Sequence, residues 1–282
     1  MTITSSLQAR TVAGLEVLER PGSGPTVLAL PGLGSSGWTF EALAESMPDI
    51  ALHAVSLAGR GGSDVATCAP GLVGHAQAVA AVAEQLDLRD VVVIGHSMGA
   101  YLAPVVAQAM PDRVRHLVLV DGGIRPGLPF FLRPGMARLK FRQELTKTKG
   151  PFADLDAVLK NARVAPMVAD RPDLTPVVTR MLERELGGVP GAWVTRTDID
   201  RCVDDAIDTF FGSSVAAAVA ALTVPARVLL AENAKKAGQK PFINDRAVAA
   251  AVARQPLLHV TRLPGNHVTV LFAPEVVEAV RA

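Results

Sequence analysis

The feature that most constrains how this chain can fold is the segment 91–99, Val-Val-Val-Ile-Gly-His-Ser-Met-Gly. Its first four residues have the composition of a buried β-strand, and a helical pattern begins near Met98. A serine on such a sharp strand-to-helix turn is held out at the end of the sheet, and Gly95 and Gly99 leave room for the chain to turn. We therefore predict that Ser97 is a nucleophile.

Short apolar runs alternate with helical patterns along most of the chain. This alternation predicts an α/β fold, with a mainly parallel sheet and helices on both of its faces. The predicted strands lie at 11–18, 26–30, 51–55, 91–94, 114–120, 226–231 and 257–263, and the predicted helices at 38–47, 73–88, 98–110, 245–254 and from 274 onward.

The pattern changes between residues 125 and 212, where repeated prolines break the sequence into short helical pieces without strands. We expect residues 125–212 to form a helical cap over the site, inserted after the strand 114–120. Residues 1–124 and 213–282 would then form the core.

A serine hydroxyl needs a base within hydrogen-bond reach, and His267 is the best placed of the six histidines. It follows the last predicted strand, at the edge where the carboxyl ends of parallel strands gather and ligands bind. The imidazole needs a carboxylate in turn. Asp121 and Glu232 both follow strands and precede His267, and we favour Asp121 because Gly122 and Gly123 let its side chain turn toward the site. Glu232 remains the alternative acid, and a purely capping role for Asp121 is also open.

A developing oxyanion needs backbone N–H donors. The first should be the N–H of Met98, which follows the nucleophile at a helix N-terminus, and the second that of Leu33, between Gly32 and Gly34 in the loop after the strand 26–30. A phosphate-binding role for this loop is disfavoured, because it lacks the lysine and hydroxyl residue of Gly-x-x-x-x-Gly-Lys-Ser/Thr. The residues that we expect to line the substrate pocket are Gly32, Trp38 and His96.

Together these motifs resemble the α/β-hydrolase superfamily, over residues 11–280. The matching pieces are Pro-Gly-Leu-Gly at 31–34, Gly-Arg-Gly-Gly-Ser-Asp at 59–64, Gly-His-Ser-Met-Gly at 95–99 and Asn-His at 266–267. The resemblance implies a mostly parallel eight-stranded sheet, a helical cap between strands six and seven, and catalysis without a cofactor. It does not identify a substrate, because one fold hosts many chemistries.

The chain departs from this family in three places. Pro31 stands where the oxyanion loop usually has a histidine, which leaves the backbone donors in place. Ser56 stands where members often have an aspartate. Ala234 stands at the commonest position of the catalytic acid, so the resemblance favours the position used by some relatives after strand six, which is Asp121.

Composition limits the partners and the location. The net charge is +1 with lysines and arginines spread along the chain, which argues against nucleic acid or a membrane surface. The two cysteines have no metal-ligand spacing, so we expect neither a bound metal nor a disulfide framework. Residues 1–20 lack a basic start followed by an apolar block, and the uncharged stretches are not about 20 strongly apolar residues long, so we expect neither a secretory signal nor a membrane span. We expect a cytoplasmic monomer or homodimer that binds a small molecule.

The elbow of dehalogenases and epoxide hydrolases carries an aspartate, so Ser97 favours acyl transfer. We expect it to attack an ester-like carbonyl and form an acyl-enzyme that water hydrolyses. A lactonase, a carbon–carbon bond hydrolase and a non-catalytic ligand-binding module remain alternatives. Apolar side chains of the predicted cap could form its own small core or line a pocket for an apolar substrate, among them Phe130, Phe131, Leu132, Met136, Leu139, Phe141 and Phe210.

Overall fold

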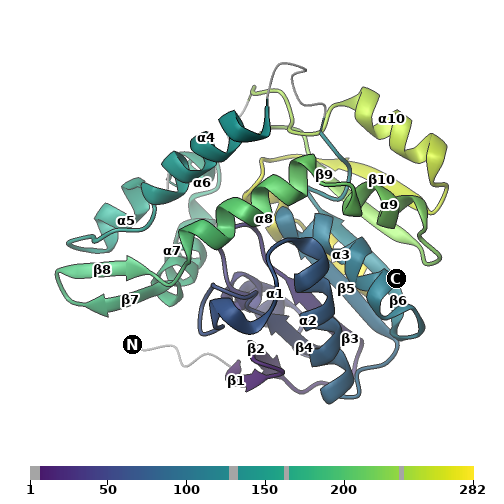
Figure 1. Cartoon of the computed structure of the whole chain (residues 1–282), viewed down its shortest axis with the longest axis horizontal. Coiled ribbons are helices and arrows are strands. Elements are labelled where there is room, and N and C mark those ends of the chain that lie inside the picture. Colours follow the sequence, from purple (N-terminus) through teal and green to yellow (C-terminus); the bar gives the residue numbers. More distant parts are fainter. Residues whose placement is uncertain (1–6, 127–132, 162–164, 235–237) are drawn as a thin grey trace.

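The computed structural model describes residues 7–126, 133–161, 165–234 and 238–282. Within these residues, an eight-stranded sheet has the strand order β1-β2-β4-β3-β5-β6-β9-β10 (Figure 1). The pairs β1–β2 and β2–β4 are antiparallel, and the other neighbours are parallel, which confirms the predicted fold class. The strands are β1 (Gln8–Val12), β2 (Leu15–Arg20), β3 (Thr26–Leu30), β4 (Ala51–Val55), β5 (Val91–His96), β6 (Val114–Val120), β9 (Ala226–Ala231) and β10 (Leu258–Leu263).

The two faces of the sheet are covered by different helices, because side chains alternate along each strand. Val91 and Val93 of β5 pack into one core cluster, whereas Val92 and Ile94 pack into another. The first cluster includes residues of α2 (Leu72–Gln85), α3 (Met98–Ala109), α9 (Ser214–Ala220) and α10 (Asp245–Arg254). The second includes residues of the 3-10 helix Gly37–Phe40, α1 (Glu41–Ser46) and α11 (Pro274–Arg281).

The carboxyl ends of the parallel strands meet at one edge of the sheet. Leu30 of β3 pairs with Gly95 of β5, and His96 of β5 pairs with Val120 of β6. On the far side of β6, β9 and β10 end together in the pair Ala231 and Leu263. The loops that leave these strands carry the predicted site residues, so the register of the sheet brings their backbones to the same edge.

The segment 125–212 between β6 and α9, which we call the insertion, lies in its described parts along one side of the sheet (Figure 1). The sequence predicted no strands in it, and that prediction is wrong: β7 and β8 form an antiparallel hairpin. Gly188 and Gly191 have φ angles of 97° and 87°, so the Val-Pro-Gly segment is the turn of a hairpin rather than a break between helices. The insertion contains α4 (Pro134–Thr146), α5 (Leu155–Asn161), α6 (Ala165–Val168), the 3-10 helix Pro172–Leu174, α7 (Thr175–Arg184), β7 (Leu186–Val189), β8 (Ala192–Thr195) and α8 (Ile199–Phe211).

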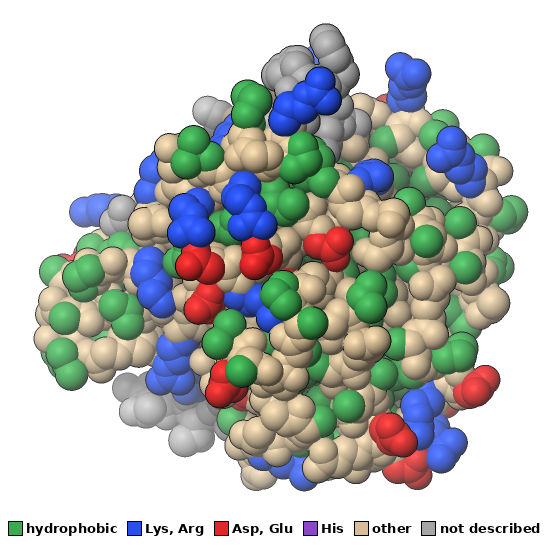
Figure 2. Space-filling model, in the orientation of Figure 1, with side chains coloured by type: hydrophobic (Ala, Val, Ile, Leu, Met, Phe, Trp, Pro, Cys, Tyr) green, Lys and Arg blue, Asp and Glu red, His purple; other side chains and the backbone are tan. Residues whose placement is uncertain are grey.

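Helix α8 joins the insertion to the core through buried charges. Asp205 of α8 has a fully buried side chain, which pairs with the Arg60 guanidinium at 2.6 Å and accepts a hydrogen bond from His75 Nε2 at 2.8 Å. On the outer face of α8, ion pairs to α4 connect Arg138 with Asp204 and Arg142 with Asp200, where Figure 2 shows blue and red side chains in contact. Since a buried charge is tolerated only when it is paired, the Asp205 cluster fixes where α8 crosses the core.

Candidate active site

Ser97 occupies the turn between β5 and α3 in a conformation that side chains rarely adopt, with φ 54° and ψ −118°. The two glycines of the motif are needed for close packing. A β-carbon on Gly95 would lie 2.2 Å from the carbonyl oxygen of Gly99, and one on Gly99 would lie 2.0 Å from that of Leu30. The turn therefore forms only with glycine at both positions, and it leaves the serine side chain at the carboxyl edge of the sheet.

A chain of two hydrogen bonds joins Ser97, His267 and Asp121. Nδ1 of His267 lies 2.5 Å from Asp121 Oδ2, and Nε2 lies 2.9 Å from Ser97 Oγ. A carboxylate can only accept, so Nδ1 donates to Asp121, and Nε2 is left to accept the proton of the Ser97 hydroxyl. The Asp121 side chain is 2% exposed and that of His267 is 22% exposed, so the carboxylate is shielded while the imidazole is reachable.

The Asp121 carboxylate is held by the neighbouring strand as well as by His267. Its Oδ1 accepts a hydrogen bond from the backbone N–H of Ala231 at 3.1 Å. The residue has a φ of 47°, and a β-carbon on Gly122 would lie 2.5 Å from the Ser97 carbonyl oxygen. Glu232, the alternative acid, is exposed at the end of β9. The structure thus brings Asp121, and not Glu232, to the imidazole.

The loop 31–36 after β3, which we call the oxyanion loop after its predicted role, lies directly beside Ser97. A β-carbon on Gly32 would be 3.3 Å from Ser97 Cβ, so the backbone just before the predicted donor Leu33 packs against the serine. Met98 is the first residue of α3, and the first N–H groups of a helix have no acceptor within it. Met98 thus follows Ser97 directly, and Leu33 follows the glycine that contacts it.

Ser56, for which the resemblance predicted an aspartate in many family members, has a carboxylate behind it. Ser56 Oγ accepts a hydrogen bond from the backbone N–H of Gly37 at 3.1 Å and donates to Glu16 at 2.6 Å. The Ser56 hydroxyl thus links the Glu16 carboxylate on β2 to the backbone N–H of Gly37, directly after the oxyanion loop. This pair explains how the loop is supported without the aspartate.

His96 supports the loop that carries His267. Its Nε2 donates to the backbone carbonyl of His267 at 2.8 Å, and the two ring centroids are 4.9 Å apart. Burial, together with the nearby His267, lowers the pKa of His96 to about 4, so its ring is neutral at physiological pH. Gly32 lies on its other side, with a β-carbon position 3.6 Å from His96 Nδ1.

The contacts of Trp38 in the structure join the insertion to the core. Its ring lies under the Arg184 guanidinium, 4.6 Å from the centroid, and packs against the core cluster of α1 and α11. A cation over an aromatic face is a stabilising contact, and here it joins α7 of the insertion to the core. A place for Trp38 in the substrate pocket stays a prediction.

Phe242 lies at the site but was missed by the sequence analysis. Its ring is 5.1 Å from that of His267 in an edge-on arrangement, and the residue is 44% exposed. It belongs to the loop that follows β9 at the carboxyl edge of the sheet. Its position in such a loop was the available signal, because binding residues concentrate there.

The aromatic residues of the insertion pack largely on one another and on the core. Phe141 of α4 stacks on Phe210 of α8 with centroids 5.6 Å apart, and Phe210 contacts Tyr101 of α3 edge-on at 5.9 Å. Met136 and Leu139 are exposed. Phe130, Phe131 and Leu132 lie outside the described residues.

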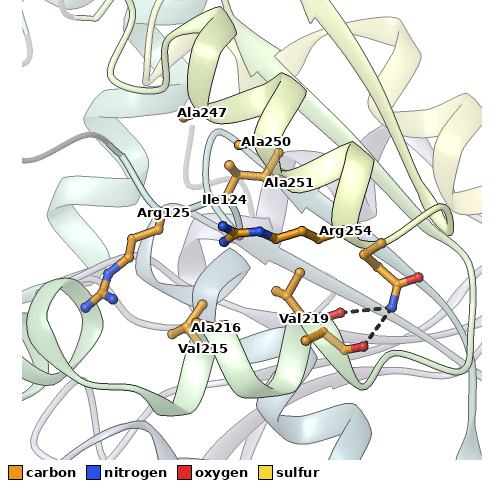
Figure 3. A pocket seen from close by; sticks show the side chains of 12 residues that line it. Ile124, Arg125, Val215, Ala216, Val219, Ala247, Ala250, Ala251 and Arg254 are labelled. Carbon is orange, nitrogen blue, oxygen red and sulfur yellow. Dashed lines mark hydrogen bonds between the residues drawn. The ribbon is translucent and has the colours of Figure 1, made fainter.

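A separate cavity of about 190 Å³ lies between α9, α10 and the loop after β6. Alanine and valine side chains form most of its wall, and Figure 3 shows Arg254 reaching across it from α10. Neither Ser97 nor His267 lines it. It is therefore distinct from the site at the end of β5.

Comparison with protein families agrees with this geometry. Residues 27–280 match the model of the alpha/beta hydrolase family. The chain belongs to the alpha/beta hydrolase family. The match includes the oxyanion loop, the serine turn and the loop of His267, so the predicted family is confirmed.

Relatives of this alpha/beta hydrolase include proteins named as lipases and esterases. It is 32% identical over 157 residues to Lipase LipV of Mycobacterium tuberculosis, covering 50% of this chain and 57% of that protein. It is 32% identical over 120 residues to the uncharacterized protein Rv2715 of the same organism, covering 42% of this chain and 35% of that one. The chain thus spans less than two thirds of the length of these curated relatives.

Solved structures show the same fold. A crystal structure of E-2-(acetamidomethylene)succinate hydrolase aligns with a TM-score of 0.78 at 23% identity, covering 96% of each chain. The M. tuberculosis esterase Rv0045c aligns with a TM-score of 0.68 at 22% identity, covering 94% of this chain and 86% of that one. Across the described ranges, no helix of this hydrolase is long and apolar enough to cross a membrane. The same ranges contain no cluster of three or more histidine, cysteine or acidic side chains suited to a metal.

Proposed function

We propose that this alpha/beta hydrolase is a serine hydrolase that cleaves an ester-like bond through an acyl-enzyme. The observation that carries the proposal is the hydrogen-bonded chain from Ser97 through His267 to Asp121, with Gly32 packed against Ser97 and the predicted oxyanion donors Leu33 and Met98 directly following Gly32 and Ser97. It combines a nucleophile, a base, a residue that orients the base, and donors for an oxyanion. The names of the related lipase and esterases agree with it.

In the first half-reaction, Ser97 Oγ attacks the carbonyl carbon while His267 Nε2 takes the hydroxyl proton. The carbonyl oxygen becomes negatively charged and is stabilised by the N–H groups of Leu33 and Met98. Asp121 keeps the proton on Nδ1 of His267 and stabilises the imidazolium. The tetrahedral intermediate then collapses, and the leaving alcohol receives its proton from Nε2.

In the second half-reaction, water attacks the acyl-enzyme. His267 Nε2 takes a proton from the water, and the resulting tetrahedral intermediate expels Ser97 Oγ, which recovers that proton. The products are a carboxylic acid, an alcohol and the free enzyme. The strained φ of Ser97 is maintained throughout by the packing of Gly95 and Gly99, so the nucleophile stays aligned with the base.

The side chains near the reacting groups favour a largely apolar substrate. Phe242 presents an exposed ring beside His267, and the side chains of Leu145 and Thr197 approach Gly34 of the oxyanion loop at 3.7 and 4.0 Å from its β-carbon position. Leu145 and Thr197 belong to the insertion, which we propose to be a cap over the site, comprising residues 125–212. An apolar wall with few polar groups is the usual composition of a small-molecule site.

The test is labelling with a fluorophosphonate, mapped by mass spectrometry, together with turnover of p-nitrophenyl esters. We expect a single adduct on Ser97, measurable turnover, and loss of both in Ser97→Ala with an unchanged melting temperature. Tight binding of a small molecule without turnover would instead support a non-catalytic module. Turnover that survives in Ser97→Ala would remove this serine from the mechanism.

A further inference from the structure

Glu185 is a buried carboxyl group that reaches from the insertion to the oxyanion loop. It follows the last residue of α7 and is 8% exposed. Its Oε1 accepts two hydrogen bonds from Ser36, one from the backbone N–H and one from the hydroxyl, both at 2.7 Å. These contacts join residues 149 positions apart in the sequence, so they exist only when the insertion is docked on the core.

A second contact from the insertion reaches the same loop. Thr197 Oγ1 donates to the backbone carbonyl of Gly34 at 3.1 Å. The two contacts are fixed relative to each other, because the backbone N–H of Arg196 donates to the Glu185 carbonyl at 2.8 Å. Lys149 adds a further connection by donating to the carbonyl of Thr197 at 2.6 Å. The base of the β7–β8 hairpin thus holds the loop at two points.

The oxyanion loop needs such support because of its own sequence. Leu33 lies between two glycines, and Gly34 has a φ of 79°. Glycine allows the close approach to Ser97, but it also leaves the backbone with many accessible conformations. The direction of the Leu33 N–H therefore depends on what anchors the residues on either side of it.

We infer that Glu185, assisted by Thr197, is a positioning residue for the oxyanion donor Leu33. This inference depends on the proposed serine hydrolase function. By accepting both donors of Ser36, Glu185 fixes the downstream end of the loop, and Thr197 fixes Gly34 directly after Leu33. The insertion thereby takes part in transition-state stabilisation rather than only covering the substrate.

The surroundings of Glu185 show that burying its carboxyl group against Ser36 costs stability. Its second oxygen, Oε2, is buried without a hydrogen-bond partner among the described residues. Burial raises the pKa of Glu185 to about 7; the hydrogen bonds from Ser36 and the charge of Arg196 oppose this rise, and the charge of Glu16 adds to it. A buried acid with an unpartnered oxygen is destabilising, so its presence here is explained more readily by the loop than by stability.

The experiment compares Glu185→Ala, Glu185→Gln and Thr197→Val in steady-state hydrolysis of p-nitrophenyl acetate and in inhibition by a boronic acid. The boronic acid forms a tetrahedral adduct with a serine, with an oxygen in the oxyanion position. Misplacing a donor lowers kcat by about tenfold to a hundredfold, so we expect that loss in Glu185→Ala with KM changed less than about threefold. The boronic acid inhibition constant should rise by the same factor as kcat falls.

Glu185→Gln keeps a carbonyl acceptor for Ser36, so unlike Glu185→Ala it should keep kcat within about threefold of the wild-type value. Thr197→Val is nearly isosteric and should lose about threefold to tenfold in kcat, which tests the inference even if Glu185→Ala does not fold. Glu41→Gln is the matched control, because Glu41 is 5% exposed and joins the core to Arg180 and Arg184 of α7 without touching the oxyanion loop. We expect its kcat to be unchanged.

The inference is overturned if Thr197→Val or a folded Glu185→Ala keeps wild-type kcat, or if Glu41→Gln loses as much kcat as Glu185→Ala does. It is also overturned if KM rises while kcat and boronic acid inhibition stay constant. Failure of the proposed function would be seen differently. In that case the wild-type protein itself would not hydrolyse the ester, or Ser97→Ala would hydrolyse it equally well.

Discussion

Replacing Glu185 by glutamine should make the protein more stable, relative to the wild type, at alkaline pH than at acid pH. Glutamine keeps the shape of the side chain and an acceptor for Ser36, and it removes the ionisation. The carboxyl group of Glu185 is buried, so it carries a penalty whenever it is charged in the folded protein. The substitution removes that penalty only at pH values where the wild-type group is ionised.

The magnitude follows from the two pKa values. Burial is the largest cause of the rise of the Glu185 pKa from 4.5 to about 7 in the folded protein. Between these values the folded protein binds a proton that the unfolded chain has released, so stability falls as the pH rises through this window. At about 1.4 kcal/mol per pKa unit, the full loss is about 3 kcal/mol above pH 7. Below pH 4.5 the group is protonated in both states and the loss is absent.

The assay is urea unfolding of the wild type and of Glu185→Gln at about pH 4.5 and about pH 8.5, at constant ionic strength. Circular dichroism monitors the unfolding and gives the free energy of unfolding at each pH. The glutamine amide places an N–H group where Oε2 has no partner, which costs about 1–3 kcal/mol at both pH values. The quantity to compare is therefore the difference in unfolding free energy between Glu185→Gln and the wild type, and how this difference changes between the two pH values. We expect Glu185→Gln to gain about 3 kcal/mol relative to wild type on going from the acid to the alkaline condition.

An exposed glutamate provides the control for this measurement. Glu84 lies exposed on α2, and Glu84→Gln should change the free energy of unfolding by less than about 0.5 kcal/mol at either pH. If Glu185→Gln shows the same difference from wild type at both pH values, the reasoning is refuted. The carboxyl would then be solvated or paired in solution.

Three further outcomes are expected. Asp121→Asn should lower kcat by about four orders of magnitude because it removes the acceptor that fixes the His267 tautomer; Glu232→Gln should leave kcat within about twofold, and the reverse result in ester turnover would reassign the acid. Phe242→Ala should raise KM for p-nitrophenyl octanoate about fivefold or more and leave that for the acetate nearly unchanged, since only the long acyl chain can use the ring; equal effects on both esters would contradict this. Gly99→Ala should destabilise by about 2 kcal/mol or more because its β-carbon meets the Leu30 carbonyl, and an unchanged melting temperature would disprove that packing argument.

Much of the fold could be predicted because it depends on local patterns. Apolar runs of strand length, followed by helical spacing, identified the main parallel strands and the helix after Ser97. The structure confirmed the α/β class because these patterns record burial on both faces of a sheet. The hairpin β7–β8 was missed, since its glycines and proline indicate a turn but not what the turn connects.

The site was predictable where a residue follows a strand at the carboxyl edge. Ser97, Asp121 and His267 all have this position, and the structure brings them into hydrogen-bond contact. Phe242 has a comparable position without a motif, and it was overlooked. The sequence also did not predict that the Arg184 guanidinium, from a residue far away in the chain, lies over the ring of Trp38.

By itself the sequence determined which residue stands in the sharp turn, because only glycine permits the close contacts on either side of Ser97. It also limited the acid to two carboxylates that end neighbouring strands. Only the tertiary structure decided between them, because the choice depends on the direction in which each side chain leaves its strand. The contact between Glu185 and Ser36 likewise could not be predicted from a local sequence pattern. It forms only when the insertion, more than a hundred residues away in the chain, packs onto the oxyanion loop.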